Sequence, residues 1–166
     1  MDIIGNIVST NLSNLSTLNQ FSLHVLRSLE VLDMSAVTTC ENFSKTAGTQ
    51  EYQWLNASPK IIYLSNTDME KAVANRKYNA SIAVVNGGTF PEDTDFTTDH
   101  LATPTKANYK FLGWYENADC TGTPATTLKT NQTYYAGWEP KVASTISFND
   151  NFVLNMTYNG SEYIVD

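Results

Sequence analysis

Charged residues are scarce in this chain. Lys, Arg, Asp and Glu make up 16% of its 166 residues, and 17 acidic residues against 10 basic ones give a formal net charge of −7. Binding to nucleic acid requires a basic surface that displaces counterions, and an anionic membrane surface attracts the same kind of surface. The charge balance therefore predicts a protein that does not bind nucleic acid.

Cysteine and histidine are also rare, and this limits metal and redox chemistry. The two cysteines, Cys40 and Cys120, are about 80 positions apart and form no CxxC pair, which excludes a zinc ribbon or a thioredoxin-like motif. A disulfide between them stays an alternative, but two independent thiols are the favoured interpretation. His24 and His100 are too few and too scattered for a metal centre, so no cofactor is expected.

Long apolar runs are missing as well. No stretch approaches the ~18 apolar residues that a membrane-spanning helix needs, so we expect no membrane insertion. The first residues, 1–5, lack the basic and apolar regions of a signal peptide. We expect either a cytoplasmic protein or a mature fragment with an added Met1, and the resemblance described below favours the fragment.

Catalytic motifs are absent from the sequence too. There is no GxSxG elbow, no HExxH and no phosphate-binding loop. Cys40 and His24 are better explained as a small half-buried thiol and a surface imidazole than as a reactive pair. The acidic stretch 92–99 lacks the glycine and the terminal Glu of an EF-hand loop, so a solvated loop is favoured over a calcium site. The expectation is a protein that is not an enzyme.

Aromatic residues make up 11% of the chain, and two short segments concentrate them. Residues 110–115 and 133–138 each contain a Gly-Trp pair, and their composition predicts strands of a small aromatic sheet. Regular alternation would place Phe111, Gly113 and Tyr115 on one face of the first strand, and Leu112 and Trp114 on the other. The residues expected to form the structural core of this part are Phe111, Gly113, Trp114, Tyr115, Tyr134 and Trp138.

The first part of the chain, residues 1–78, has a leucine-rich pattern. The apolar spacing of residues 12–26 fits a helix face or a leucine-rich connector. Residues 26–35 and 60–69 then show the cadence of two leucine-rich repeats, with Leu32 and Leu64 equivalent at a separation of 32 residues. Residues 69–78 contain good helix formers and predict a short closing helix. About three repeats are needed for stability, so this part reads as the end of a longer solenoid.

Two further regions follow. Residues 79–140 contain a β-branched strand at 81–85, an Asn-Gly-Gly turn at 86–88 and the two aromatic strands. Residues 141–166 contain strand candidates at 145–148, 152–158 and 162–165. The last region is too short to build its own core, so it either docks on the preceding domain or begins another one, with a faint similarity to a bacterial immunoglobulin-like domain.

The middle region resembles the Listeria–Bacteroides repeat, also called the internalin B-repeat. The resemblance rests on Asn-Gly-Gly at 86–88, on Thr-Pro-Thr at 103–105 followed by an aromatic Gly-Trp-Tyr strand at 109–115, and on Thr-Tyr-Tyr-Ala-Gly-Trp at 133–138. Asn108 replaces the usual glycine, a mild departure because Asn tolerates a positive φ. The leucine-rich segment, over about residues 28–69, is similar to the repeats of BspA-type surface proteins.

These resemblances imply an α+β, mostly β protein, with a partial leucine-rich-repeat segment followed by a small β-grasp-like domain. They imply an extracellular location on a bacterial surface and a role in adhesion or protein–protein interaction. A structural spacer and a carbohydrate-binding module are the alternatives, and the partner would be a protein or a glycan on a host or neighbouring cell. Tyr52 and Trp54 are the candidate contact residues. Aromatic rings lining an open cleft beside ionisable groups would contradict this interpretation.

Overall fold

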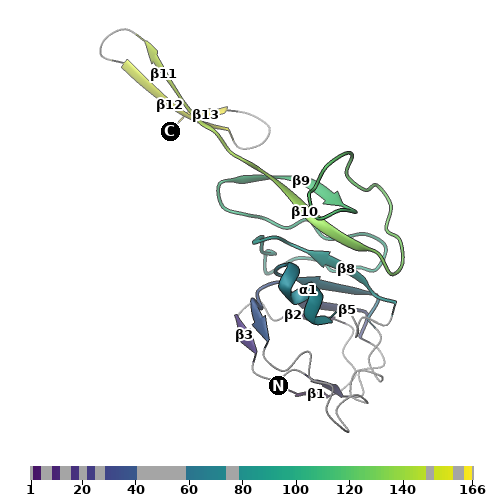
Figure 1. Ribbon diagram of the computed structural model, residues 1–166. Coiled ribbons are helices and arrows are strands. Elements are labelled where there is room, and N and C mark those ends of the chain that lie inside the picture. Colours follow the sequence, from purple (N-terminus) through teal and green to yellow (C-terminus); the bar gives the residue numbers. More distant parts are fainter. Residues whose placement is uncertain are drawn as a thin grey trace.

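The computed structural model describes residues 2–4, 9–11, 16–18, 22–24, 29–40, 59–73, 79–148, 152–158 and 163–165. The protein is mostly β-sheet, as expected, and the described residues contain one α-helix (Figure 1). The elements in chain order are β1 (Asp2–Ile4), β2 (Ser9–Asn11), β3 (Thr17–Leu18), β4 (Ser22–His24), β5 (Val31–Met34), β6 (Thr39–Cys40), β7 (Ile61–Leu64), α1 (Thr67–Val73), β8 (Ser81–Val84), β9 (Tyr109–Tyr115), β10 (Thr133–Pro140), β11 (Ala143–Phe148), β12 (Phe152–Tyr158) and β13 (Tyr163–Val165).

The largest sheet has six strands in the order β2-β5-β7-β8-β10-β9. The first five are parallel to their neighbours, and β9 pairs antiparallel with β10 at one edge. Every residue of β5, β7 and β8 is buried. Parallel strands covered on both faces are apolar along their whole length, which explains continuous runs such as Ile-Ile-Tyr-Leu in β7.

The N-terminal strands stack as successive coils. β1, β2 and β3 pair in parallel with β4, β5 and β6, respectively. Paired residues are 20 positions apart in the first pair (Asp2 beside Ser22) and 22 apart in the others (Ser9 beside Val31, Thr17 beside Thr39). A nearly constant offset is the geometry of a solenoid, in which each coil packs on the one before.

This stacking corrects the expectation of a helix face within residues 12–26. Strands β3 and β4 occupy the described parts of that segment. Here the pairing of one coil with the next satisfies backbone groups, in place of hydrogen bonds within a helix. The alternative of a leucine-rich connector is the better description.

The register between β5 and β7 corrects a second expectation. Leu32 lies beside Ile62, and Met34 lies beside Leu64, so the offset is 30 residues and Leu32 is not the partner of Leu64. A slip of two residues leaves every side chain on the same face of a strand, so the leucine pattern alone does not distinguish the two registers.

The expected boundary between residues 78 and 79 lies inside the main sheet. β8 follows β7 in the stack with an offset of 20 residues, and it pairs with β10 on its other side. Thus β8 is both the next rung after the leucine-rich strands and the first strand of the aromatic part. The two segments share one sheet.

Helix α1 covers one face of this sheet (Figure 1). Asn66 caps it, because its Oδ1 accepts hydrogen bonds from the backbone N–H groups of Asp68 (3.0 Å) and Met69 (2.9 Å). The predicted helix at 69–78 therefore begins two residues earlier and is observed to Val73, and residues 74–78 lie outside the described part. On this face, the helix-side core consists of Leu29, Leu32, Met34, Val37, Ile62, Leu64, Met69, Val73, Ala80, Ile82 and Val84, with Tyr135 packed against it.

The other face of the sheet is covered by two loops, residues 86–108 and 116–132. Aromatic rings from both ends of the sheet meet here, and Tyr63 of β7 lies 4.9 Å from Phe90 and 6.4 Å from Trp114 between ring centroids. This loop-side core consists of Val31, Ile61, Tyr63, Ala83, Val85, Phe90, Ala102, Trp114, Tyr134 and Ala136, with Phe96, Leu101, Phe111, Ala125, Leu128 and Trp138 packed against it.

The hairpin of β9 and β10 is irregular, and this corrects the expected faces of β9. Gly113 has φ of 128°, and the register shifts at the bulge between Gly137 and Trp138. As a result, Phe111 and Trp114 lie on the same face with ring centroids 5.7 Å apart, whereas strict alternation would separate them. Leu112 is the displaced residue and is 40% exposed.

The last three strands form a separate antiparallel sheet in the order β11-β12-β13. They cover the three strand candidates expected between residues 141 and 166. β10 runs toward β11, and this sheet projects from the end of the main sheet opposite to β1 (Figure 1). In the described residues, no helix has the length and apolar character to cross a membrane.

Candidate functional site

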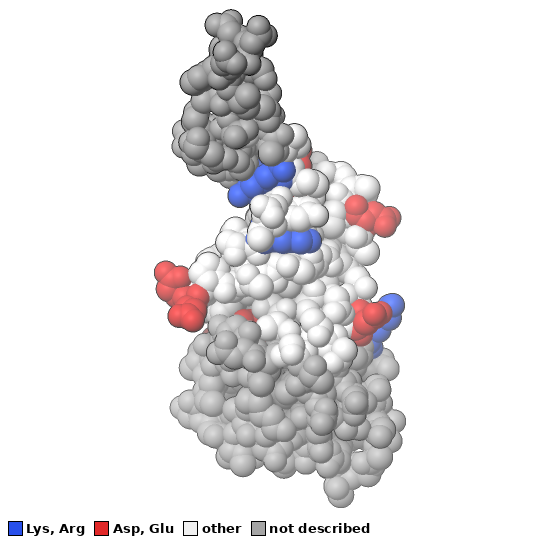
Figure 2. Space-filling view, turned by 90° about the vertical axis from the view of Figure 1, so that its left-hand side faces the viewer, with Lys and Arg blue, Asp and Glu red and all other residues white. Residues whose placement is uncertain are grey.

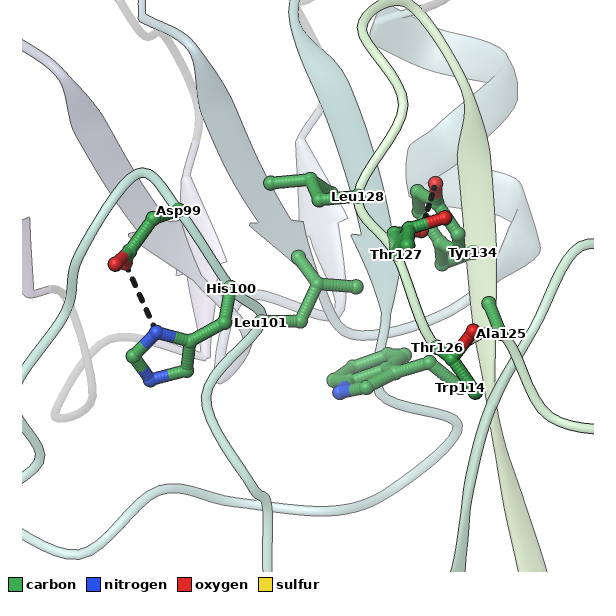
Figure 3. Close-up of a pocket in the computed structure, with 9 residues that line it drawn as sticks. All are labelled: Asp99, His100, Leu101, Trp114, Ala125, Thr126, Thr127, Leu128 and Tyr134. Atoms are coloured by element: carbon green, nitrogen blue, oxygen red, sulfur yellow. Dashed lines mark hydrogen bonds and ion pairs between the residues drawn. The ribbon is translucent and has the colours of Figure 1, made fainter.

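A groove opens on the loop side of the main sheet. It consists of two adjoining hollows of about 450 and 380 Å³, which share Asp99 and Leu128. Figure 3 shows the first hollow, with Asp99 and His100 on one side and Thr126 and Thr127 on the other. The first is lined by Asp99, His100, Leu101, Trp114, Ala125, Thr126, Thr127, Leu128 and Tyr134, and the second by Pro59, Lys60, Ile61, Asn79, Ser81, Thr98, Asp99, Leu128 and Thr130.

The first wall belongs to loop 89–105. Two backbone hydrogen bonds between Thr89 and Thr105 close its base, at 2.8 and 2.7 Å. Its far side is held at Ala102, whose N–H donates to the hydroxyl of Tyr63 (2.9 Å) and whose carbonyl accepts from Nε1 of Trp114 (3.2 Å). One peptide is thus clamped by a ring of β7 and a ring of β9.

The second wall belongs to loop 116–132 and is also fixed by a ring. The hydroxyl of Tyr134 accepts from the N–H of Lys129 (2.7 Å) and donates to the carbonyl of Thr127 (3.3 Å). The N–H of Ala125 donates to the carbonyl of Trp114 (2.7 Å). The groove therefore lies between two loops whose positions are set by core tyrosines and a tryptophan.

Trp114 and Tyr134 line this groove near two ionisable residues, an arrangement that has to be weighed against the expectation of sequestered rings. Trp114 is 7% exposed and Tyr134 is 1% exposed. Their polar atoms are already bonded to backbone groups, as described above. The rings form the floor of the groove through a small part of their surface and remain in the core, whereas Asp99 and His100 are exposed at the rim.

The rim residues do not have the geometry of an acid–base–nucleophile array. In such an array, the hydroxyl contacts one ring nitrogen of the histidine and the carboxylate contacts the other. Here Nδ1 of His100 lies 2.9 Å from Asp99 Oδ1 and 2.9 Å from the Thr97 hydroxyl, which also contacts Asp99 Oδ1. Hydrogen bonds from Thr97 and then His100 lower the pKa of Asp99, so this carboxylate is a stable acceptor and not a proton donor.

The thiol of Cys120 is free and is not activated. Its Sγ lies 3.6 Å from the carbonyl of Ala136, and burial followed by the charge of Asp119 raises its pKa. A reactive thiol requires the opposite shift. The free thiol agrees with the favoured interpretation of two independent cysteines. The side chains of Cys40 and His24 lie outside the described residues.

No metal site is found among the described residues, where no group of three His, Cys, Asp or Glu side chains converges. The acidic stretch 92–99 lies in the exposed part of loop 89–105. It does not gather its carboxylates around one point.

Asp33 is an unusual buried acid on the loop side of the sheet. It is 1% exposed, and its Oδ1 accepts a hydrogen bond from the N–H of Ser35 (2.9 Å). Within the described residues no group donates to its Oδ2, and burial raises its pKa. It lies beside Tyr63 in the strand register.

The remaining predicted residues are placed as follows. Tyr115 is buried, Phe111 and Trp138 are partly buried against the loop-side core, and Trp138 Nε1 donates to the carbonyl of Val85 (3.0 Å). Gly113 lies at the hairpin bulge described above. The candidate contact residues Tyr52 and Trp54 lie outside the described part of the chain.

The sequence interpretation did not identify Tyr63, Ala102, Asp99 and His100 as residues that build the groove. For Tyr63, the available signal was a single polar-tipped ring in an otherwise aliphatic strand, because a buried tyrosine hydroxyl requires a partner. The other three lie in a loop with no periodic pattern. Comparisons with protein-family models, with curated proteins and with solved structures found no match for the chain.

Proposed function

We propose that this chain is a non-catalytic module of a bacterial cell-surface or secreted protein, in which a leucine-rich solenoid is joined rigidly to a B-repeat-like domain. Its task is to hold binding surfaces in a fixed orientation for adhesion or protein–protein interaction. The observation that carries this proposal is the clamp on Ala102, where Tyr63 of the solenoid strands and Trp114 of the hairpin grip one peptide.

Two further features support a rigid junction. Ser65 Oγ donates to the carbonyl of Val37 (2.5 Å) and the N–H of Val85 donates to the carbonyl of Leu64 (2.8 Å), so successive turns are linked. On the opposite face, Glu70 of α1 accepts a hydrogen bond from the hydroxyl of Tyr135 in β10 (3.1 Å). Burial and the charge of Glu70 raise the pKa of Tyr135 to about 12, which keeps the phenol protonated as a donor at neutral pH.

The surface supports display more directly than it supports a hydrophobic interface. Among the described residues, the large hydrophobic side chains that are exposed are Leu112 and Val142, and large apolar interaction patches need several such neighbours. Figure 2 shows a face on which charged side chains are few and do not form a cluster of one sign. The spacer role is therefore the better supported of the two within this part of the chain, and the partner surface of the adhesion role would lie elsewhere.

The parallel rungs support the assignment of the N-terminal part to a leucine-rich solenoid. The parallel pair of β8 and β10, with β9 outside it, is compatible with a β-grasp-like arrangement of the second part. The bacterial surface location rests on the sequence resemblance alone.

A distance measurement tests the rigid junction. Spin labels at Asp68 in α1 and Asn117 after β9, both exposed, report on the two sides of β8. Replacing Cys40 and Cys120 by Ser leaves the two introduced cysteines as the sole labelling sites. We expect a single narrow distance distribution by pulsed electron resonance. A broad or bimodal distribution, in a protein that melts normally, would overturn the display role.

A further inference from the structure

The groove between the two loops is polar but carries little charge. Hydroxyl side chains from both walls reach it, and its charged residues at the rim are Asp99, His100 and Lys60. Lys60 is already engaged in an ion pair with Glu30 (2.7 Å). The hydroxyl and amide residues that line the groove are Thr98, Thr126, Thr127, Thr130, Asn79 and Ser81.

Apolar side chains alternate with these polar groups. Leu101 and Leu128 project toward the space between the loops, with Trp114 at the floor (Figure 3). Asp99 and Leu128 line both hollows, so one polar and one apolar residue stand where the two meet. The volume of each hollow falls in the range of small-molecule sites.

From this arrangement we propose that the groove binds a short neutral oligosaccharide, with one sugar unit in each hollow and Asp99 at the linkage between them. Sugar hydroxyls donate to the carboxylate of Asp99 and exchange hydrogen bonds with the hydroxyls of Thr126 and Thr127. The aliphatic C–H face of a sugar ring packs on Leu101 and Leu128.

The charge pattern argues for a neutral sugar over other ligands. An anionic ligand needs a free cation, but in the described lining the lysine is paired with Glu30 and Asp99 is negative. Asp99 remains ionised at neutral pH because Thr97 and His100 lower its pKa, so it is a permanent acceptor for hydroxyl groups. A peptide would require an apolar pocket for a side chain, whereas most of this lining is hydroxyl, amide or carboxylate.

The proposal is separate from the display role. The walls of the groove are set by the core rings, so the junction is rigid whether or not a ligand is bound. A failure of sugar binding leaves the spin-label distance unchanged, and a flexible junction leaves the groove residues in place.

Binding is tested with the whole chain against neutral disaccharides (maltose, cellobiose, lactose and diacetylchitobiose) by ligand-observed NMR and calorimetry. Asp99→Asn and Thr127→Val remove a charge and a hydroxyl with little change in volume, and the Thr127 carbonyl still accepts from Tyr134. Asp93→Asn and Thr123→Val are the matched controls, because both residues are exposed and line neither hollow.

We expect at least one neutral sugar to bind with Kd of about 1 mM or tighter, a free energy of about −4 kcal/mol. Asp99→Asn or Thr127→Val should weaken binding roughly tenfold, whereas the controls change it less than twofold, with melting temperatures preserved throughout. The proposal is overturned if no neutral sugar binds, if binding survives both groove variants, or if charged sugars or peptides bind in preference. Either groove variant decides the result if the other fails to fold.

Discussion

The hydroxyl of Tyr63 offers the sharpest perturbation of the junction. Tyr63 is fully buried in β7, and its hydroxyl accepts the N–H of Ala102, which is 5% exposed. Tyr63→Phe keeps the ring and its contacts with Phe90 and Trp114 but leaves that N–H without its acceptor. Burial raises the pKa of Tyr63, so the group removed is a neutral phenol.

The cost follows from leaving a buried backbone donor unpaired, roughly 1–3 kcal/mol. For a chain of this size, 1 kcal/mol shifts the melting temperature by about 2–4 °C, so the expected decrease is roughly 2–12 °C. The matched control is Tyr115→Phe, since Tyr115 is also buried but its hydroxyl has no hydrogen bond to the described residues. That change should cost clearly less than Tyr63→Phe.

Amide hydrogen exchange adds the spatial part of this prediction. In Tyr63→Phe, loop 89–105 should exchange faster although the mutation lies in the solenoid strands. Equal stability of the two variants, or faster exchange confined to β7, would refute the reasoning that one peptide links the two parts.

Three other changes have defined outcomes. Trp114→Ala removes a buried indole and its bond to Ala102, and should lower the free energy of unfolding by about 3–5 kcal/mol; an unchanged melting curve would show that the ring is not in the core. Gly137→Ala places a Cβ against the ring of Tyr115 and should cost roughly 1–3 kcal/mol by denaturant titration, whereas alanine at the open site Gly122 has no such overlap although its φ of 85° adds strain. Asp33 has a higher pKa in the folded than in the unfolded chain, so its contribution to stability falls as pH rises above its ordinary value of 3.8. Asp33→Asn should therefore gain stability relative to the parent between about pH 4 and pH 7, and a difference that is constant with pH would contradict the assignment.

The strands were predictable where the sequence pattern has one physical cause. Residues 110–115 and 133–138 combine aromatic and β-branched side chains, and both are strands. The last three strands also match their expected positions within two residues. The leucine pattern predicted parallel rungs at β5 and β7, but not their register, because a two-residue shift buries the same face.

What the sequence did not reveal are the features that depend on long-range contacts. The bulge beside Gly113 reverses the side of Phe111, and it arises from the pairing of β9 with β10. Likewise, the clamp on Ala102 joins residues 39 positions apart, and neither partner has a local signal for the other. The groove follows from these contacts, so it was not visible from motifs.

The central claim is that the leucine-rich strands and the aromatic hairpin form one cooperative body around β8. Hydrogen exchange of the unmodified protein in increasing denaturant tests it most directly. Amides of β7 in the solenoid and of β9 and β10 in the hairpin should lose protection together, at the same denaturant concentration and with the same dependence on it. Protection that persists in β9 and β10 after β7 has exchanged would show two independent units and contradict the account.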